Sequence, residues 1–127
     1  MPDLARRFKA RRTPSTLLSL FIPSVDRRQK PIDQETWVRK AVEALARCFG
    51  KATAFPPGLG VWRDDQGGKL IVDKPVVIQC YVTAAAIAEH AAELRAFLVE
   101  MGTSTNQGAV GFVIGDDYLE IDMDEAG

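Results

Sequence analysis

Apolar positions along the chain follow two spacings, one typical of strands and one typical of helices. Residues 34–49 and 84–101 repeat apolar side chains at helical spacing, which predicts two amphipathic helices. The strand-like segments are 15–25, 61–64, 70–82, 109–114 and 118–123. Within 76–82, Val76, Ile78, Cys80 and Val82 alternate with the rest and are the predicted core face.

Local signals mark where these elements begin and end. Asp33 and Thr83 suit the N-caps of the two helices, and Gly50 and Gly102 suit their C-terminal stops. Pro75 predicts a bulge or the entry to a longer strand, since proline cannot donate to a ladder. Gly115-Asp116 predicts a two-residue turn between the last two strands.

The order strand, helix, strand, strand, helix, strand matches the ferredoxin-like split βαβ plan. This is an α+β sandwich with two helices on one face of a four- to five-stranded, mainly antiparallel sheet. We expect a basic flexible arm at 1–14, one domain at 15–123 and an acidic tail at 124–127. The plan also gathers three loops at one end of the sheet, bringing Asp26, Asp64 and Asn106 toward one another.

The first strand is apolar on both sides, which is typical of a central strand covered on both faces. If one face meets the helices, Phe21 and Val77 lie on the other, together with Tyr81. A large uncovered apolar face is rare in water, so we expect a partner, or a second copy packed sheet to sheet, at Phe21 and Val77.

Size and composition are those of one globular domain: 127 residues, 46% hydrophobic and 26% charged. No apolar run approaches the ~20 residues that span a bilayer. The basic N-terminus is not followed by a long apolar block with a cleavage site, which disfavours a secretory signal. We expect a cytoplasmic protein without a membrane partner.

Charge is uneven although the net charge is only −1. Lysine and arginine cluster near the N-terminus, and the last stretch, 101–127, holds acids and no lysine or arginine. The cluster could be a solvated leader, pair with the acidic tail, or bind an acidic protein; an acidic pI disfavours nucleic acid. Its members are Arg6, Arg7, Lys9, Arg11 and Arg12.

Candidate chemistry is sparse. His90 is a lone histidine off the apolar stripe of its helix, so a solvated position is expected, and Cys48 and Cys80 are interpreted as buried reduced thiols. No zinc-ligand spacing is present, and Gly58-Leu59-Gly60 precedes a strand rather than the helix of a phosphate site. The sequence therefore predicts no catalytic residue, no metal site and no cofactor.

Trp62-Arg63 is the most unusual pair in the sequence. The tryptophan either packs in a core or dimer interface, or lines a pocket in which Arg63 clamps an anion. In the second interpretation Tyr81 completes the pocket, and the polar residues Asn106 and Gln107 lie at the same end of the sheet. These five residues are the candidates for ligand binding.

Several of these features occur together in a known family. Phe49, Pro57-Gly58, Gly60-Val61-Trp62-Arg63 and Gln107-Gly108-Ala109-Val110 resemble a bacterial family of small α+β domains of unknown function that carries a Gly-x-Trp-Arg strand. The resemblance covers roughly residues 17–114 and excludes the charged ends. It implies a ferredoxin-like fold and brings no activity with it.

Two functions remain open from the sequence. The first is a non-catalytic binding or regulatory module that acts through its sheet face in a homodimer or a hetero-complex. The alternative is a small dimeric α+β enzyme or anionic-ligand binder with a Trp62/Arg63/Tyr81 pocket. An RNA-binding sheet is disfavoured, because no Lys/Arg-Gly-Phe-Gly-type strand accompanies the aromatic residues.

Overall fold

The structure is a computed structural model that describes residues 3–126. Its helices are α1 (Leu4–Arg7), α2 (Gln34–Phe49), α3 (Ala84–Ser104) and α4 (Met123–Ala126). Its strands are β1 (Thr16–Ile22), β2 (Thr53–Ala54), β3 (Gly60–Arg63), β4 (Leu70–Asp73), β5 (Val76–Val82), β6 (Ala109–Ile114) and β7 (Asp117–Asp122).

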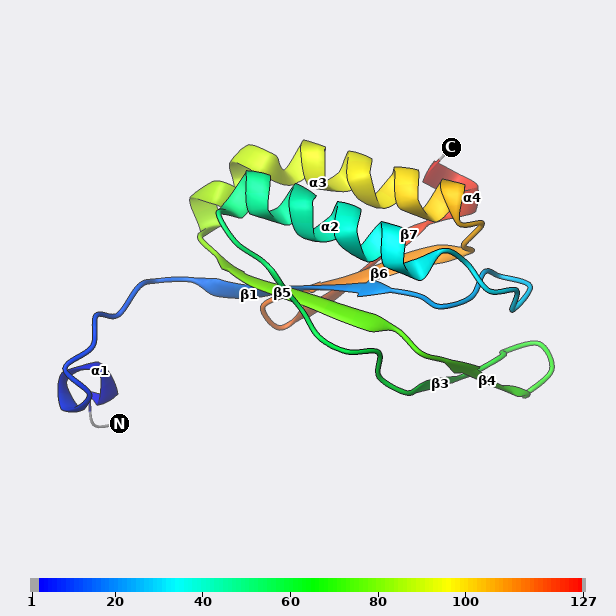
Figure 1. Ribbon diagram of the computed structural model, residues 1–127, viewed down its shortest axis with the longest axis horizontal. Helices are drawn as coiled ribbons and strands as arrows, with labels where there is room; N and C mark the ends of the chain where they lie inside the picture. Colours follow the sequence, from blue (N-terminus) through cyan, green and yellow to red (C-terminus); the bar gives the residue numbers. More distant parts are fainter. Residues whose placement is uncertain (1–2, 127) are drawn as a thin grey trace.

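Five of the strands form one antiparallel sheet in the order β2-β5-β1-β6-β7. β1 is central and pairs with β5 from Thr16↔Val82 to Ile22↔Val76. The two long helices, α2 and α3, lie side by side on the same face of this sheet (Figure 1). The predicted ferredoxin-like α+β sandwich is confirmed.

Both long helices begin where the sequence predicts. The Asp33 side chain accepts a hydrogen bond from the Thr36 N–H, and the Thr83 hydroxyl accepts one from the Ala86 N–H. Gly50 ends α2 with φ at 95°, a left-handed conformation that glycine adopts without the steric cost of a Cβ.

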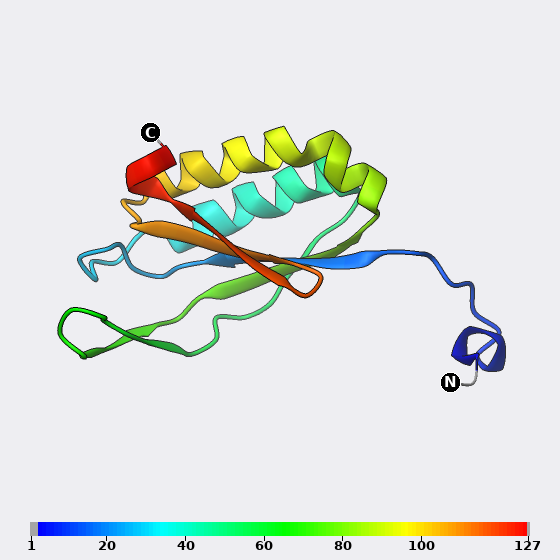
Figure 2. The same cartoon turned by 180° about the vertical axis from the view of Figure 1, so that it is seen from behind.

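The core lies between these helices and the sheet. Leu18, Leu20 and Ile22 of β1 are fully buried, and the predicted alternation in β5 is confirmed. The opposite face of the sheet has no covering layer within residues 3–126 (Figure 2). The expectation that β1 is covered on both faces is therefore wrong for the single chain.

Two predicted strands are arranged differently from the expectation. The segment 61–64 does not join the main sheet: β3 pairs only with β4, in a separate two-stranded hairpin. The strand that takes its place at the sheet edge is the two-residue β2, paired with Gln79 and Ile78. The long predicted strand 70–82 is split at Lys74-Pro75, because proline at this position cannot continue the ladder.

Gly102 does not end the second helix, which continues to Ser104. The glycine is buried, and a Cβ at this position would overlap the Met123 side chain and Val110 Cγ2. Its role is to let α3 approach α4 and β6 closely rather than to stop the helix.

The first and last described helices, α1 and α4, lie far apart (Figure 1). The segment from 3 to 14 projects from the domain and contains the turn α1, in which Arg12 pairs with Asp3 at 3.3 Å. Residues 124–126 of the expected acidic tail belong to α4, which packs against α3. In this geometry the arm and the tail of one molecule do not meet. Gly127 lies outside the described residues.

Candidate functional site

The uncovered sheet face is organised by three cross-strand pairs between β1 and β5. Leu17 lies opposite Tyr81, and Phe21 lies opposite Val77. Between them the Gln79 side chain donates to the Ser19 hydroxyl at 3.1 Å. Ser19 is only 5% exposed although no layer of the described chain covers it, because the larger side chains around it shield it. Across β1 and β5 the face is therefore an apolar surface with one satisfied polar pair at its centre.

β6 and β7 extend this face with an aromatic residue. The ring of Tyr118 in β7 lies over Gly111 of β6, where a Cβ would collide with the phenol ring and hydroxyl. The Tyr118 hydroxyl donates to Glu120 at 3.3 Å. Partial burial of the ring, followed by the nearby Glu120 carboxylate, raises the pKa of the Tyr118 phenol above its ordinary value.

The β3–β4 hairpin projects beyond the end of the main sheet (Figure 1). Its base is fixed by Asp73, whose carboxylate accepts hydrogen bonds from the Ser24 N–H at 2.9 Å and the Ser24 hydroxyl at 2.6 Å. The Gly58 N–H also donates to the Pro75 carbonyl at 2.8 Å. The hairpin is thus held in a defined direction, although it has only two strands.

Apolar side chains cover both faces of this hairpin. On one face Trp62 pairs with Ile71, which is buried. On the other face Val61 lies opposite Val72, and Leu70 follows on the same side; all three are more than half exposed. A two-stranded hairpin is marginally stable in water. The exposed stripe is therefore a candidate interaction surface.

A hollow of about 580 Å³ lies where the hairpin base meets the end of the main sheet. Trp62 contributes an aromatic wall and Tyr118 another. The charged groups around it are Asp26, Asp73, Glu120 and Arg27, so carboxylates outnumber cations. The remaining lining residues are Pro23, Val25, Gln107, Gly108 and Ala109.

Two of the three loops expected at this end of the sheet meet beside the hollow, whereas Asp64 lies at the turn of the projecting hairpin. The Arg27 N–H donates to the Asn106 carbonyl at 3.0 Å, and the Gln107 side chain donates to the Val25 carbonyl at 3.0 Å. The Arg27 guanidinium donates to the Gln107 carbonyl at 2.7 Å and pairs with Asp124 at 3.3 Å. Arg27 is thus engaged by the protein itself.

The structure brings together only part of the predicted ligand site. Trp62 and Gln107 line the same hollow, whereas Tyr81 lines a separate one of about 260 Å³ with Leu17 and Phe55. Arg63 lines neither hollow and lies exposed opposite Leu70 near the hairpin turn. The single Trp62/Arg63/Tyr81 pocket is therefore not formed, because the hairpin leaves the main sheet and carries Trp62 and Arg63 away from Tyr81.

Sequence reasoning missed Tyr118, Glu120 and Asp73 as parts of the hollow. The signal for Tyr118 was its position in the last strand, three residues after the glycine turn, on the face opposite the core. The predicted partner residues of the arm, Arg6, Arg7, Lys9, Arg11 and Arg12, are all exposed, and they belong to the segment that projects from the domain. Phe21 and Val77 are half-buried on the open sheet face.

Comparison with known proteins gives a fold and no family. No family model matches the sequence, and no curated protein matches it. A phage SAM lyase in complex with S-methyl-5′-thioadenosine superposes with a TM-score of 0.66 at 15% identity, covering 88% of this chain and 93% of the lyase. A phage SAM lyase in its apo state gives 0.60 at 17% identity and the same coverage.

A third structure, the divalent cation tolerance protein Cut A1 from Thermus thermophilus, superposes with a TM-score of 0.54 at 15% identity. The superposition covers 79% of this chain and 81% of the Cut A1 chain. At these identities the likeness shows the fold alone: the chain is a ferredoxin-like α+β domain. Among residues 3–126, no helix is both long and apolar enough to cross a bilayer.

Proposed function

We propose that this chain is a non-catalytic binding module that works as a self-associated complex, in which a second copy covers the projecting hairpin and the open sheet face. The observation that carries the proposal is the exposed stripe of Val61, Leu70 and Val72 on a two-stranded hairpin. Such a stripe gains stability only when another surface covers it.

The size of the exposed apolar surface supports a stable interface. The hairpin stripe, Leu59, Trp62, Phe55 and the two tyrosines of the open face are each between 46% and 75% exposed. Specific interfaces bury ~800 Å² per partner, and these exposed apolar side chains are the part of the described surface that would contribute to such an area. Two sheets of this kind can stack face to face at a spacing of about 10 Å.

A second copy is favoured as the occupant by the two ends of the chain. The arm projects from the domain with Phe8 77% exposed and several basic residues around it. The far end of the domain, around β7 and α4, is rich in acids, including Asp122 and Asp124. The arm of one copy therefore complements the acidic end of another in charge, whereas the arm and α4 of one molecule lie apart (Figure 1).

Sedimentation velocity from low to high micromolar concentration tests this proposal. We expect the wild type to sediment as an oligomer and Leu70→Lys to shift it toward the monomer, because a lysine in the stripe places a charge in the interface. Ala88→Lys adds the same charge on an exposed turn of α3 and is the matched control. A monomeric wild type, or a Leu70→Lys variant that associates like the wild type, contradicts the proposal.

The Trp62–Tyr118 hollow supports a second candidate, a small-ligand binder. Its volume falls within the ~300–1,000 Å³ of ligand sites, and it offers an aromatic face beside several carboxylates. The excess of acids disfavours the anionic ligand expected from the sequence and favours a neutral or cationic one. The lyase crystallised with S-methyl-5′-thioadenosine supplies a probe, a flat base attached to a ribose whose hydroxyls can donate to carboxylates.

Tryptophan fluorescence tests this candidate. Titration with S-methyl-5′-thioadenosine is expected to quench the wild-type signal in a saturable manner, and Trp62→Phe, which leaves Trp37 as reporter, is expected to lose the response. Glu120→Gln is expected to weaken binding. A wild-type signal that does not change, or a response that persists without Trp62, excludes this ligand class at the hollow.

A further inference from the structure

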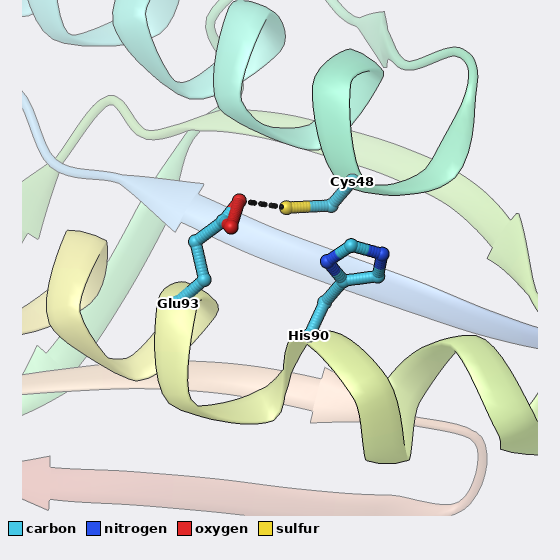
Figure 3. Close-up of side chains that lie close together, drawn as sticks. All are labelled: Cys48, His90 and Glu93. Carbon is cyan, nitrogen blue, oxygen red and sulfur yellow. Dashed lines mark hydrogen bonds between the residues drawn. The ribbon is translucent and has the colours of Figure 1, made fainter.

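Three potential metal ligands converge between the two long helices, away from the Trp62–Tyr118 hollow and the open sheet face. Cys48 lies in the last turn of α2, and His90 and Glu93 lie one turn apart on α3. One ligand atom from each residue lies within 4.8 Å of the other two. Figure 3 shows the three side chains turned toward one another across the gap between the helices.

The chemistry of the three side chains is complementary to a borderline-soft cation. A thiolate, an imidazole and a carboxylate are the ligand types that bind Zn²⁺, and a tetrahedral zinc ion places its ligand atoms about 3.5 Å apart. The Cys48 thiol already donates to Glu93 Oε2 at 2.7 Å. The three ligand atoms therefore lie within about 1.3 Å of the separations that such an ion needs.

A neighbouring carboxylate and an aromatic ring lie beside the histidine, the carboxylate beyond hydrogen-bond distance. Nε2 of His90 lies 3.9 Å from Glu89 Oε2, while the other ring nitrogen faces Cys48 and Glu93 (Figure 3). Histidines that bind metals usually direct their second nitrogen to a carboxylate or carbonyl, which fixes the ring. The ring also packs edge-on against Phe49 at 5.7 Å between centroids. His90 is thus not the solvated residue that its position in the sequence suggests.

The surroundings allow a cation to enter and favour its charge. A hollow of about 540 Å³ opens beside the three residues, and Leu94 and Phe97 form its apolar wall. The charged groups that face it are Glu93 and Glu100 from α3 and Arg47 from α2, with Glu89 behind His90. Carboxylates therefore outnumber the single guanidinium.

We propose that Cys48, His90 and Glu93 bind one divalent cation of the zinc type between α2 and α3. A fourth coordination position stays open to water from the hollow beside Leu94 and Phe97. Burial, with the nearby Glu93, raises the pKa of the Cys48 thiol to about 11. The cation therefore displaces a proton as the Cys48 sulfur binds it. The site joins the C-terminal end of α2 to the middle of α3.

Cobalt substitution tests the site with a readout that only thiolate coordination produces. We titrate the full chain, reduced with a phosphine, with Co²⁺ and then with Zn²⁺. The wild type is expected to bind one equivalent of Co²⁺ with a thiolate-to-cobalt charge-transfer band and visible bands of tetrahedral cobalt, which Zn²⁺ then abolishes.

Variants distinguish this site from adventitious binding. Cys48→Ser is expected to lose the charge-transfer band, and His90→Gln and Glu93→Gln are each expected to weaken Zn²⁺ binding at least about tenfold. Cys80→Ser, at the other cysteine, and Glu100→Gln, on the rim of the same hollow, are the matched controls and keep the band.

Thermal unfolding supplies a second measurement. Zn²⁺ is expected to raise the melting temperature of the wild type and of Glu100→Gln, but not that of Glu93→Gln, whose exposed position makes the substitution harmless to the fold. A wild type without the charge-transfer band, a band that survives Cys48→Ser, or a band that disappears with Cys80→Ser overturns the proposal.

Discussion

Replacing Gly102 with alanine sets two opposing contributions to the free energy of unfolding against each other. Alanine in the interior of a helix is more favourable than glycine by about 1 kcal/mol. Against this, the new methyl group would lie 2.7 Å from Val110 Cγ2 and would overlap the side chain of Met123. The balance depends on which of these neighbours can move.

Val110 has little room to move. It is 3% exposed, belongs to the core and pairs with Ile121 in the β6–β7 ladder. Met123 is flexible and half-buried, so it can yield at lower cost. Overpacking of this kind costs about 1–3 kcal/mol. The overlap with Val110 therefore outweighs the gain in helix propensity, and we expect Gly102→Ala to destabilise the protein by up to about 2 kcal/mol.

Urea unfolding followed by far-ultraviolet circular dichroism measures this difference. Gly108→Ala is the matched control, because a Cβ at Gly108 meets no atom within 4 Å, and its stability is expected to stay within about 0.5 kcal/mol of the wild type. Adding Met123→Ala to Gly102→Ala is expected to recover part of the loss. If Gly102→Ala proves as stable as the wild type or more so, Gly102 is not needed for close packing and the reasoning fails.

Three further outcomes are expected. Leu20→Ala removes a fully buried side chain from the central strand and should cost about 2–5 kcal/mol in urea unfolding, whereas Leu70→Ala, exposed in the hairpin, should cost little. Asp33→Ala should destabilise α2 at neutral pH, because hydrogen bonds from Thr36 lower the pKa of Asp33 below its ordinary 3.8. The contribution of Asp33 to stability is therefore fully present above pH 3.8 and disappears as the pH falls through the lowered pKa. The stabilities of the wild type and the variant should therefore converge in acid. A difference in stability that stays constant at all pH values would contradict this. Deletion of residues 1–12 should leave stability within about 1 kcal/mol but weaken self-association, more at low salt than at high, as sedimentation can measure.

Sequence reasoning was most successful where a few neighbouring residues decide the outcome. The N-caps at Asp33 and Thr83 and the left-handed stop at Gly50 depend on hydrogen bonds and φ angles within one helical turn. The core face of Val76–Val82 follows from the period of two in a strand. With the order of elements, these local rules were enough to predict the fold class.

The choice of strand partners was decided only by the tertiary structure. The segment around Trp62 has the composition of a strand whichever neighbour it pairs with, since β-propensity reflects packing more than an intrinsic backbone preference. Pro75 breaks the ladder and lets β3 and β4 leave the main sheet together. This separation placed Trp62 beside Gln107 and Tyr118 rather than beside Tyr81.

The remaining differences have the same physical origin. Gly102 carries the local signal of a helix end, yet α3 continues through it because close contact with Val110 and Met123 requires a residue without a side chain. Cys48 and His90 lie on different helices, and no spacing along the chain indicates that they approach each other. The sequence by itself determined where the two long helices begin and where the longer strands form, through interactions that span a few residues. Packing between distant segments decided which strands pair, where the hollow lies and which side chains meet between α2 and α3.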